Sequence, residues 1–273
     1  MRVTLLGTGD TTGTPTPGCE CATCQAAVDR DVERTRFSIH VENEATGESL
    51  LVDTSPDVRY QLLRDEVALP DAIVITHIHF DHLDGLGNAY RLFESLPVYA
   101  ANETDPTTGE SVAETIDRKY DYLDRIDVCP QPPLEPFETC GFTVTLLPVE
   151  HPPFLCYGLT IKDETGAKLS ITGDTNFAIP DATRDQLADP DLLLADAIVP
   201  ARLCEHHPLG GRHENDAGVP RTVGTKHMTM EGALSLAEEL NAARTRLVHI
   251  SHFPMPEEAF GEHAAVDGER YVL

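Results

Sequence analysis

The chain has no tryptophan and only four lysines among its 273 residues. Lys and Arg together number 20 against 46 Asp and Glu, which gives a formal net charge of −26. Broad, non-specific nucleic-acid binding is therefore not expected, because it depends on cations that neutralise phosphates. We interpret the acidic excess, which is spread along the chain, as an adaptation to high salt, where self-repulsion is screened. A surface for cations or for a basic partner is the alternative.

Long apolar segments are also missing. No stretch is long and apolar enough to span a membrane, and the N-terminus lacks the basic region, apolar core and cleavage site of a signal peptide. We therefore expect a cytoplasmic protein. Apolar residues make up 41% of the chain, which predicts a globular fold rather than disorder. Because no linker or low-complexity segment interrupts the chain, we expect one domain over residues 1–273.

Cysteine is present in an odd number, seven, which argues against a disulfide framework in a reducing compartment. Cys19, Cys21 and Cys24 crowd together in a loop rich in Thr, Gly and Pro. Three thiolates supply three of the four ligands of a tetrahedral zinc site; reduced cysteines in a turn are the alternative. The remaining cysteines are scattered, and we expect them to be small buried side chains: Cys129, Cys140, Cys156 and Cys204.

The most informative stretch is His77–His82, which holds three histidines and one aspartate directly after the apolar run Ala72–Ile75. That run predicts a buried strand. His77 and His79 are two residues apart, so they project to the same side of an extended backbone. Imidazole and carboxylate are ligands that suit zinc, manganese or iron. Four such ligands this close together indicate two adjacent metal ions rather than one.

Three more candidate ligands lie at or near the ends of predicted strands: His151 after 142–149, Asp174 after 168–172, and His249 near the end of 246–250. The alternatives are a surface histidine, a capping carboxylate and a buried strand histidine. The candidates divide into two sets with Asp174 between them, and each set leaves room for water or substrate. We expect one set to be His77, His79 and His151, and the other to be Asp81, His82 and His249.

Strands and helices alternate along the chain. We expect further strands over 2–6, 36–43, 48–53, 97–100 and 157–162, a mostly apolar run over 192–199, and helices over 57–65, 86–96, 111–126 and 230–243. A loop rich in Gly, His and Pro is expected over 204–225. Its three histidines are more typical of a solvated or lid loop than of a metal site: His206, His207 and His213.

The order of these ligands resembles the metallo-β-lactamase superfamily: a His-x-His-x-Asp-His motif, then a distant His, an Asp and a last His. The resemblance covers nearly the whole chain. It implies an α/β fold, a four-layer αββα sandwich with the metals at one edge of two packed sheets. It also implies that Asp53, at the end of the 48–53 strand, holds the metal loop from behind.

The cysteine cluster and the segment His249–His252 resemble PhnP-type phosphodiesterases of the carbon–phosphorus lyase pathway. Because His252 lies three residues after His249, one loop could give His249 to the dinuclear centre and His252 to the cysteines, as the fourth ligand of a structural zinc. The resemblance also implies that His227 acts near the scissile phosphate as a general acid or phosphate-binding group. A histidine near a helix start with no role is the alternative. Asp81 is expected to be catalytic as well as a ligand.

Two metal ions about 3.5–4 Å apart can activate water and stabilise charge on a phosphate ester. We therefore expect two catalytic zinc or manganese ions and hydrolysis of a small phosphodiester. The resemblance points to 5-phosphoribosyl 1,2-cyclic phosphate, with 2′,3′-cyclic nucleotides as alternatives, and mildly favours a homodimer.

Two other functions stay open. One is a tRNA 3′-processing endonuclease of the same superfamily, against which stand the cysteine cluster, the acidic surface and the lack of a basic arm. The other is a non-catalytic carrier resembling the pyrroloquinoline quinone accessory protein, which incomplete ligands would favour.

Overall fold

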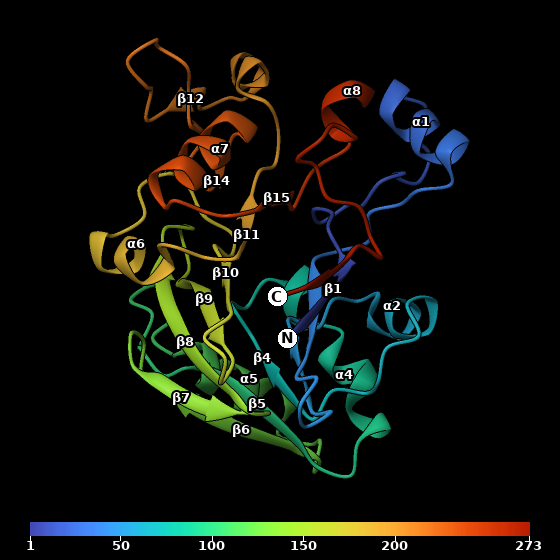
Figure 1. Cartoon of the computed structure of the whole chain (residues 1–273), viewed down its shortest axis with the longest axis vertical. Helices are drawn as coiled ribbons and strands as arrows, with labels where there is room; N and C mark the ends of the chain where they lie inside the picture. Colours follow the sequence, from blue (N-terminus) through green and yellow to red (C-terminus); the bar gives the residue numbers. More distant parts are fainter.

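Two β-sheets packed face to face form the centre of the protein, and helices cover their outer faces (Figure 1). A computed structural model describes residues 1–273. The expected four-layer αββα sandwich is confirmed by this architecture. That the whole chain is a single domain stays a prediction.

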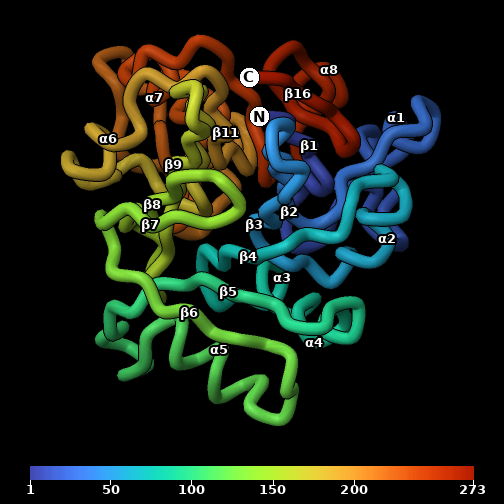
Figure 2. The backbone as a smooth tube through the Cα atoms, turned by 60° about the horizontal axis from the view of Figure 1, so that its bottom comes forward, coloured from blue at the N-terminus to red at the C-terminus, as the bar shows by residue number.

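The first sheet has seven strands. Their spatial order is β16 (Arg270–Val272), β1 (Arg2–Gly7), β2 (Ser38–Glu42), β3 (Ser49–Val52), β4 (Ala72–Val74), β5 (Leu96–Ala101) and β6 (Ile126–Gln131). Strands β3 to β6 run parallel to one another. The two chain ends meet at this sheet, where the Leu273 N–H donates to the Met1 carbonyl at 3.0 Å (Figures 1 and 2).

The second sheet has six strands, in the order β15 (Thr245–Val248), β11 (Leu192–Asp196), β10 (Lys168–Ile171), β9 (Cys156–Lys162), β8 (Phe142–Val149) and β7 (Pro136–Thr139). Strands β8, β10, β11 and β15 share one direction, because β9 is antiparallel to both β8 and β10. Their C-terminal ends therefore meet at one edge. A small third sheet joins β12 (Gly211–Arg212), β13 (Thr222–Val223) and β14 (His227–Met228).

The helices are short. They are α1 (Ala22–Arg30), α2 (Val58–Arg64), α3 (Phe80–Leu83), α4 (Leu86–Ala89), α5 (Val112–Tyr120), α6 (Asp181–Leu187), α7 (Met230–Glu239) and α8 (Pro256–Ala259). Helices α2 and α5 contact the first sheet, and α6 and α7 contact the second. None of them has the length and apolar character that a bilayer crossing requires.

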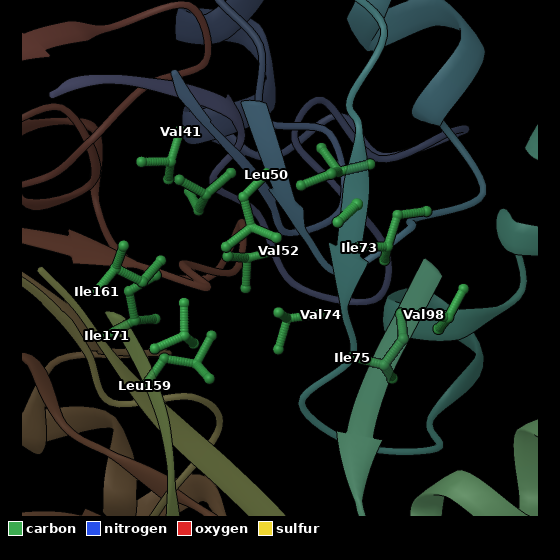
Figure 3. Close-up of a cluster of buried hydrophobic side chains, with 14 of the residues drawn as sticks. Val41, Leu50, Val52, Ile73, Val74, Ile75, Val98, Leu159, Ile161 and Ile171 are labelled. Atoms are coloured by element: carbon green, nitrogen blue, oxygen red, sulfur yellow. The ribbon is translucent and has the colours of Figure 1, made fainter. Parts of the chain in front are cut away.

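Apolar side chains fill the space between the two sheets. Leu50 and Val52 alternate with residues of the opposite face along β3, as the period of a strand requires. They point toward Leu159 and Ile161 of β9 (Figure 3). Burying each such side chain stabilises the fold by about 1.5–3 kcal/mol. The main core cluster has 41 buried residues, so the strand ends that carry the candidate ligands rest on a rigid platform.

Two predicted helices are wrong in their second halves. The segment expected to be helical over 86–96 forms α4 and a 3₁₀ turn, and β5 then begins at Leu96. Leu96 precedes Pro97, and the proline ring disfavours the helical conformation for the residue before it. The helix expected over 111–126 ends at Tyr120, and β6 begins at Ile126. Strand β6 lies at the sheet edge, where its Pro130 costs no ladder hydrogen bond.

Candidate dinuclear metal site and its flanking zinc site

The candidate ligands lie where strands of both sheets end. Strand β4 of the first sheet leads into His77–His82. In the second sheet, β8 ends before His151, β10 before Asp174 and β15 before His249. Residues far apart in sequence meet here because the C-terminal ends of these strands share one edge of the sandwich.

One group of side chains converges around His79. Its Nδ1 lies 2.8 Å from His77 Nε2 and 3.2 Å from His151 Nε2. Asp174 Oδ2 lies 3.8 Å from His77 Nε2 and 3.9 Å from His151 Nε2. Three ring nitrogens and one carboxylate oxygen thus lie within 4.8 Å of one another, which is the spacing that a single ion between them needs.

A second group lies on the other side of Asp174. Asp81 Oδ2 is 3.7 Å from both His82 Nε2 and His249 Nε2. Asp174 Oδ2 is 3.3 Å from each of these two nitrogens. The same carboxylate oxygen therefore faces both groups. The structure brings together all seven residues of the predicted centre, and their binding of metal stays a prediction.

Hydrogen bonds behind the imidazoles fix their orientation. Asp53 Oδ2 lies 2.6 Å from His82 Nδ1 and accepts a bond of 2.8 Å from the Thr76 hydroxyl. Asp53 thus lies where the family resemblance implies. His151 Nδ1 donates to the Lys226 carbonyl at 3.1 Å. Such partners fix which ring nitrogen is free to bind a metal.

The chemistry of these side chains fits a pair of divalent ions. His82 Nε2 and both ring nitrogens of His249 are buried without a hydrogen-bond partner, which is costly unless another group binds them. Burial lowers the pKa of His151 to about 3 and that of His77 well below its usual value. Although burial alone would raise the pKa of Asp174, the charges of His249 and His82 hold it well below its usual value. Neutral imidazole and ionised carboxylate are the states that metal binding requires. Although burial alone would lower the pKa of His82 and of His249, the Asp174 carboxylate raises the pKa of both, that of His249 to about 9, so ions that bind here would displace protons from these two rings.

Asp196, at the end of β11, belongs to the site but was missed from the sequence. It is 1% exposed, lies 3.0 Å from His227 Nδ1 and accepts the Thr175 backbone N–H at 3.0 Å. From the sequence, 192–199 is only a mostly apolar run. The available signal was a lone carboxylate near the end of that run, the same pattern that marks Asp174.

His227 lies beside the two ligand groups, at β14. Its ring stacks on that of His249, with centroids 4.9 Å apart and planes 14° apart, and meets the edge of the His151 ring at 4.8 Å. Since Nδ1 faces Asp196, Nε2 is left for a substrate. A ring nitrogen of His227 also lies within 4.8 Å of ligand atoms of Asp174 and His249.

The cysteine cluster meets the loop after His249. His252 Nδ1 lies 3.4 Å from Cys19 Sγ and 3.5 Å from Cys21 Sγ, and the four potential ligand atoms, with Cys24 Sγ, lie within 4.8 Å of one another. Cys21 is the N-cap of α1. Burial raises the pKa of its thiol, but hydrogen bonds from the Cys24 backbone and from His252 lower it to about 6. A thiolate is the form that binds zinc; the zinc itself stays a prediction.

The segment expected as a loop over 204–225 contains a 3₁₀ turn (Ala201–His206) and strands β12 and β13. His213 Nδ1 lies 2.7 Å from the Thr222 hydroxyl. His206 and His207 are exposed. None of the three histidines belongs to a group that could hold a metal ion.

Two packed sheets with imidazoles and carboxylates clustered at one edge define a hydrolase of the metallo-β-lactamase fold, and the clustered side chains are of the kind that binds divalent metal. The profile of the beta-lactamase superfamily domain matches residues 48–250. The chain therefore belongs to the β-lactamase superfamily.

Solved structures support this assignment. A diphosphatase from the PhnP family is 29% identical with a TM-score of 0.77, over 100% of this chain and 97% of that one, which confirms the PhnP-type resemblance. Zinc-bound PqqB from Methylobacterium extorquens is 23% identical (TM-score 0.76, 100% of each chain). The short form of human tRNase Z is 19% identical (TM-score 0.68, 100% and 99%). These last two show the fold alone.

Two curated relatives are also similar. An octanoyltransferase of Porphyromonas gingivalis is 28% identical over 270 residues, which are 94% of this chain and 48% of that protein. The chain thus spans about half the length of this relative. Coenzyme PQQ synthesis protein B of Methylobacterium radiotolerans is 28% identical over 100% of this chain and 97% of that protein.

Proposed function

We propose that the protein is a phosphodiesterase that hydrolyses a small cyclic phosphate with two divalent metal ions, zinc or manganese. The substrates we favour are 5-phosphoribosyl 1,2-cyclic phosphate and 2′,3′-cyclic nucleotides. The observation that carries the proposal is Asp174 Oδ2, which lies within 3.9 Å of ring nitrogens of both ligand groups. When bound, two such ions lower the pKa of water and stabilise charge on the attacking and leaving oxygens.

His227 supplies a proton on the leaving-group side. In hydrolysis the oxygen of water bonds to phosphorus, and the bond from phosphorus to the leaving oxygen breaks. His227 Nε2 gives its proton to that leaving oxygen, the attacking water loses a proton to solvent, and His227 regains one from solvent. Asp196, 3.0 Å from Nδ1, fixes the ring and leaves Nε2 on the side of the substrate.

Lys226 supplies a fixed positive charge in an acidic protein. The Lys226 carbonyl oxygen lies 3.1 Å from His151 Nδ1, so this residue lies beside the ligand cluster. We assign it to the phosphate oxygens that the metals leave free, since ammonium–phosphate bonds are charge-assisted.

A role in a cofactor pathway is the second candidate. It is favoured by the match to 97% of coenzyme PQQ synthesis protein B. A complete ligand set supports catalysis instead, because a carrier has no need for a shared carboxylate and an adjacent acid. Processing of tRNA rests only on a shared fold and conflicts with a net charge of −26.

The test is a panel of substrates with added Mn²⁺ or Zn²⁺: both kinds of cyclic phosphate, bis-p-nitrophenyl phosphate, nucleoside diphosphates and precursor tRNA. The diphosphates are included because the PhnP-family neighbour is a diphosphatase. We expect turnover of the cyclic phosphates. Asp81→Ala or His82→Ala should abolish it with the fold largely intact, whereas Asp117→Ala, on the exposed face of α5, serves as control. Turnover of precursor tRNA or of diphosphates alone would overturn the proposal.

A further inference from the structure

A cavity of about 500 Å³ opens beside His227. None of the seven candidate ligands of the dinuclear centre lines it, but His227 and Lys226 do. Its other walls come from the segment 198–209 and from Ser251 and Phe253 in the loop after β15. The cavity is therefore continuous with the proposed catalytic site and extends to one side of it.

The lining is largely apolar. Leu209 is 55% exposed and Phe253 is 65% exposed, although aromatic residues make up only 6% of this acidic chain. Large apolar side chains that line an open cavity are typical of a ligand site. The apolar lining residues are Ile198, Val199, Leu203, Leu209, Val223 and Phe253.

The position of His227 indicates what enters this cavity. Because His227 is assigned to protonate the leaving oxygen, the cavity lies on the leaving-group side of the phosphate. A bare sugar has no apolar face to match Leu209 and Phe253, whereas a planar ring can stack on an aromatic side chain. The lining also carries polar side chains, among them Asp10, His206 and Thr225, and the edge of a heteroaromatic ring can form hydrogen bonds with such groups whereas an alkyl chain cannot.

The loop that carries Phe253 is held by the cysteine site. The rings of His252 and Phe253 lie 4.3 Å apart, and His252 Nδ1 faces Cys19 and Cys21. On the other side, the Ser251 hydroxyl donates to the Ile198 carbonyl at 2.9 Å. The cysteine site therefore positions an aromatic wall of the cavity.

We propose that this cavity binds a planar, uncharged heteroaromatic ring carried by the leaving-group side of the phosphodiester, and that Phe253, positioned by the cysteine site, determines this specificity. The inference rests on the proposed phosphodiesterase function. It deepens that function, because of the two substrates proposed above it selects the 2′,3′-cyclic nucleotides over 5-phosphoribosyl 1,2-cyclic phosphate, which carries no heteroaromatic ring.

The test compares two substrates with the same scissile group: adenosine 2′,3′-cyclic phosphate and methyl riboside 2,3-cyclic phosphate, which lacks the base. The metal-loaded wild type should favour the base-bearing diester in kcat/KM. Stacking of a base on an aromatic side chain corresponds to roughly 5- to 100-fold, and Phe253→Ala should reduce the preference by that factor. Phe253→Tyr should keep the preference. Tyr122→Ala, which removes another exposed aromatic side chain outside the cavity, should not change it.

Calorimetric binding of adenosine 3′-phosphate and of methyl riboside 3-phosphate gives the same comparison without turnover. If neither diester is turned over, but the wild type binds adenosine 3′-phosphate more tightly than methyl riboside 3-phosphate and Phe253→Ala removes this preference, the phosphodiesterase function is overturned and the ring site stands. Turnover of both diesters with equal kcat/KM, or an equal loss on both in Phe253→Ala, would overturn the ring site and leave the phosphodiesterase standing.

Discussion

At the scale of single residues, the pairing of His227 with Asp196 decides which nitrogen of the imidazole faces the substrate. Asp196 Oδ2 lies 3.0 Å from Nδ1 and also accepts the Met228 N–H at 3.3 Å. The carboxylate is thus fixed by the backbone of the strand that carries the histidine. If His227 is the general acid that we propose, a ring held this way needs little reorganisation when it transfers its proton.

Replacing His227 tests this role. We expect His227→Ala to lower kcat by roughly 10²- to 10⁴-fold, the usual contribution of general acid–base catalysis. The content of bound metal should not change, since all seven candidate ligands remain. Steady-state kinetics combined with metal analysis measure both effects. An unaltered kcat would remove His227 from the mechanism, and a loss of metal would make it a ligand.

Lys226 makes a different kind of contribution. If its ammonium binds the phosphate, Lys226→Met should raise KM by roughly 10-fold, because a hydrogen bond to a charged group is lost, and kcat should change far less. Lys162→Met, an exposed lysine on β9, is the matched control. A KM equal to that of the wild type would show that the phosphate lies elsewhere.

The candidate ligands were predictable from the sequence, because each follows an apolar strand and the order of residue types is specific. The residues behind them were harder to find. Thr11 donates to Asp81 Oδ2 at 2.7 Å from a loop whose path no local pattern determines. Asp196 was hidden within an apolar run. Such side chains are recognised only when the fold brings distant segments together.

At the scale of elements, the loop after β15 joins the two proposed metal sites. His249 points into the dinuclear group, and His252 faces the cysteines three residues later. His249 adopts a φ of 57°, a conformation that non-glycine residues seldom adopt and that persists where the surroundings enforce it. The cysteine site would supply part of that enforcement from outside the catalytic centre.

Weakening the cysteine site should therefore affect stability before activity. We expect Cys21→Ser to lose one bound zinc and to lower the Tm by several degrees, since each kcal/mol shifts Tm by about 2–4 °C in chains near this size. Activity should fall less than stability. Cys129→Ser, outside the cluster, is the matched control. Unchanged zinc content in Cys21→Ser would contradict the site.

Elements differed in how well the sequence predicted them. Strands β4, β8, β10 and β15 were expected because each is an apolar run that ends at a polar ligand. Helix α1 was not, because it begins inside the cysteine cluster, where the Cys21 side chain caps it by accepting from the Cys24 N–H. Cys21 is thus both a candidate zinc ligand and the cap on which the start of α1 depends.

At the scale of the whole molecule, the charge of −26 is the dominant feature. The surface repels itself in dilute buffer, and raising salt from about 0.1 M to about 1 M shortens the Debye length from about 10 Å to about 3 Å. Adaptation to high salt and a homodimer stay predictions. Neither follows from the fold.

Thermal unfolding in increasing KCl tests the salt adaptation. We expect the Tm to rise by roughly 5–10 °C over that range, equivalent to a few kcal/mol, because self-repulsion destabilises the folded state at low salt. Sucrose, an uncharged osmolyte that stabilises by exclusion, is the comparison. A Tm that stays constant or falls with KCl would contradict the adaptation.

The central claim is that two ions held by the shared Asp174 carry out phosphodiester hydrolysis. Its most direct test is to titrate metal-depleted protein with Mn²⁺ or Zn²⁺ while following hydrolysis of a 2′,3′-cyclic phosphate and counting bound metal. The account predicts no turnover without metal and full turnover only when two ions are bound in addition to the zinc at the cysteines. Full turnover with a single added ion, or no diester hydrolysis with both bound, would contradict it.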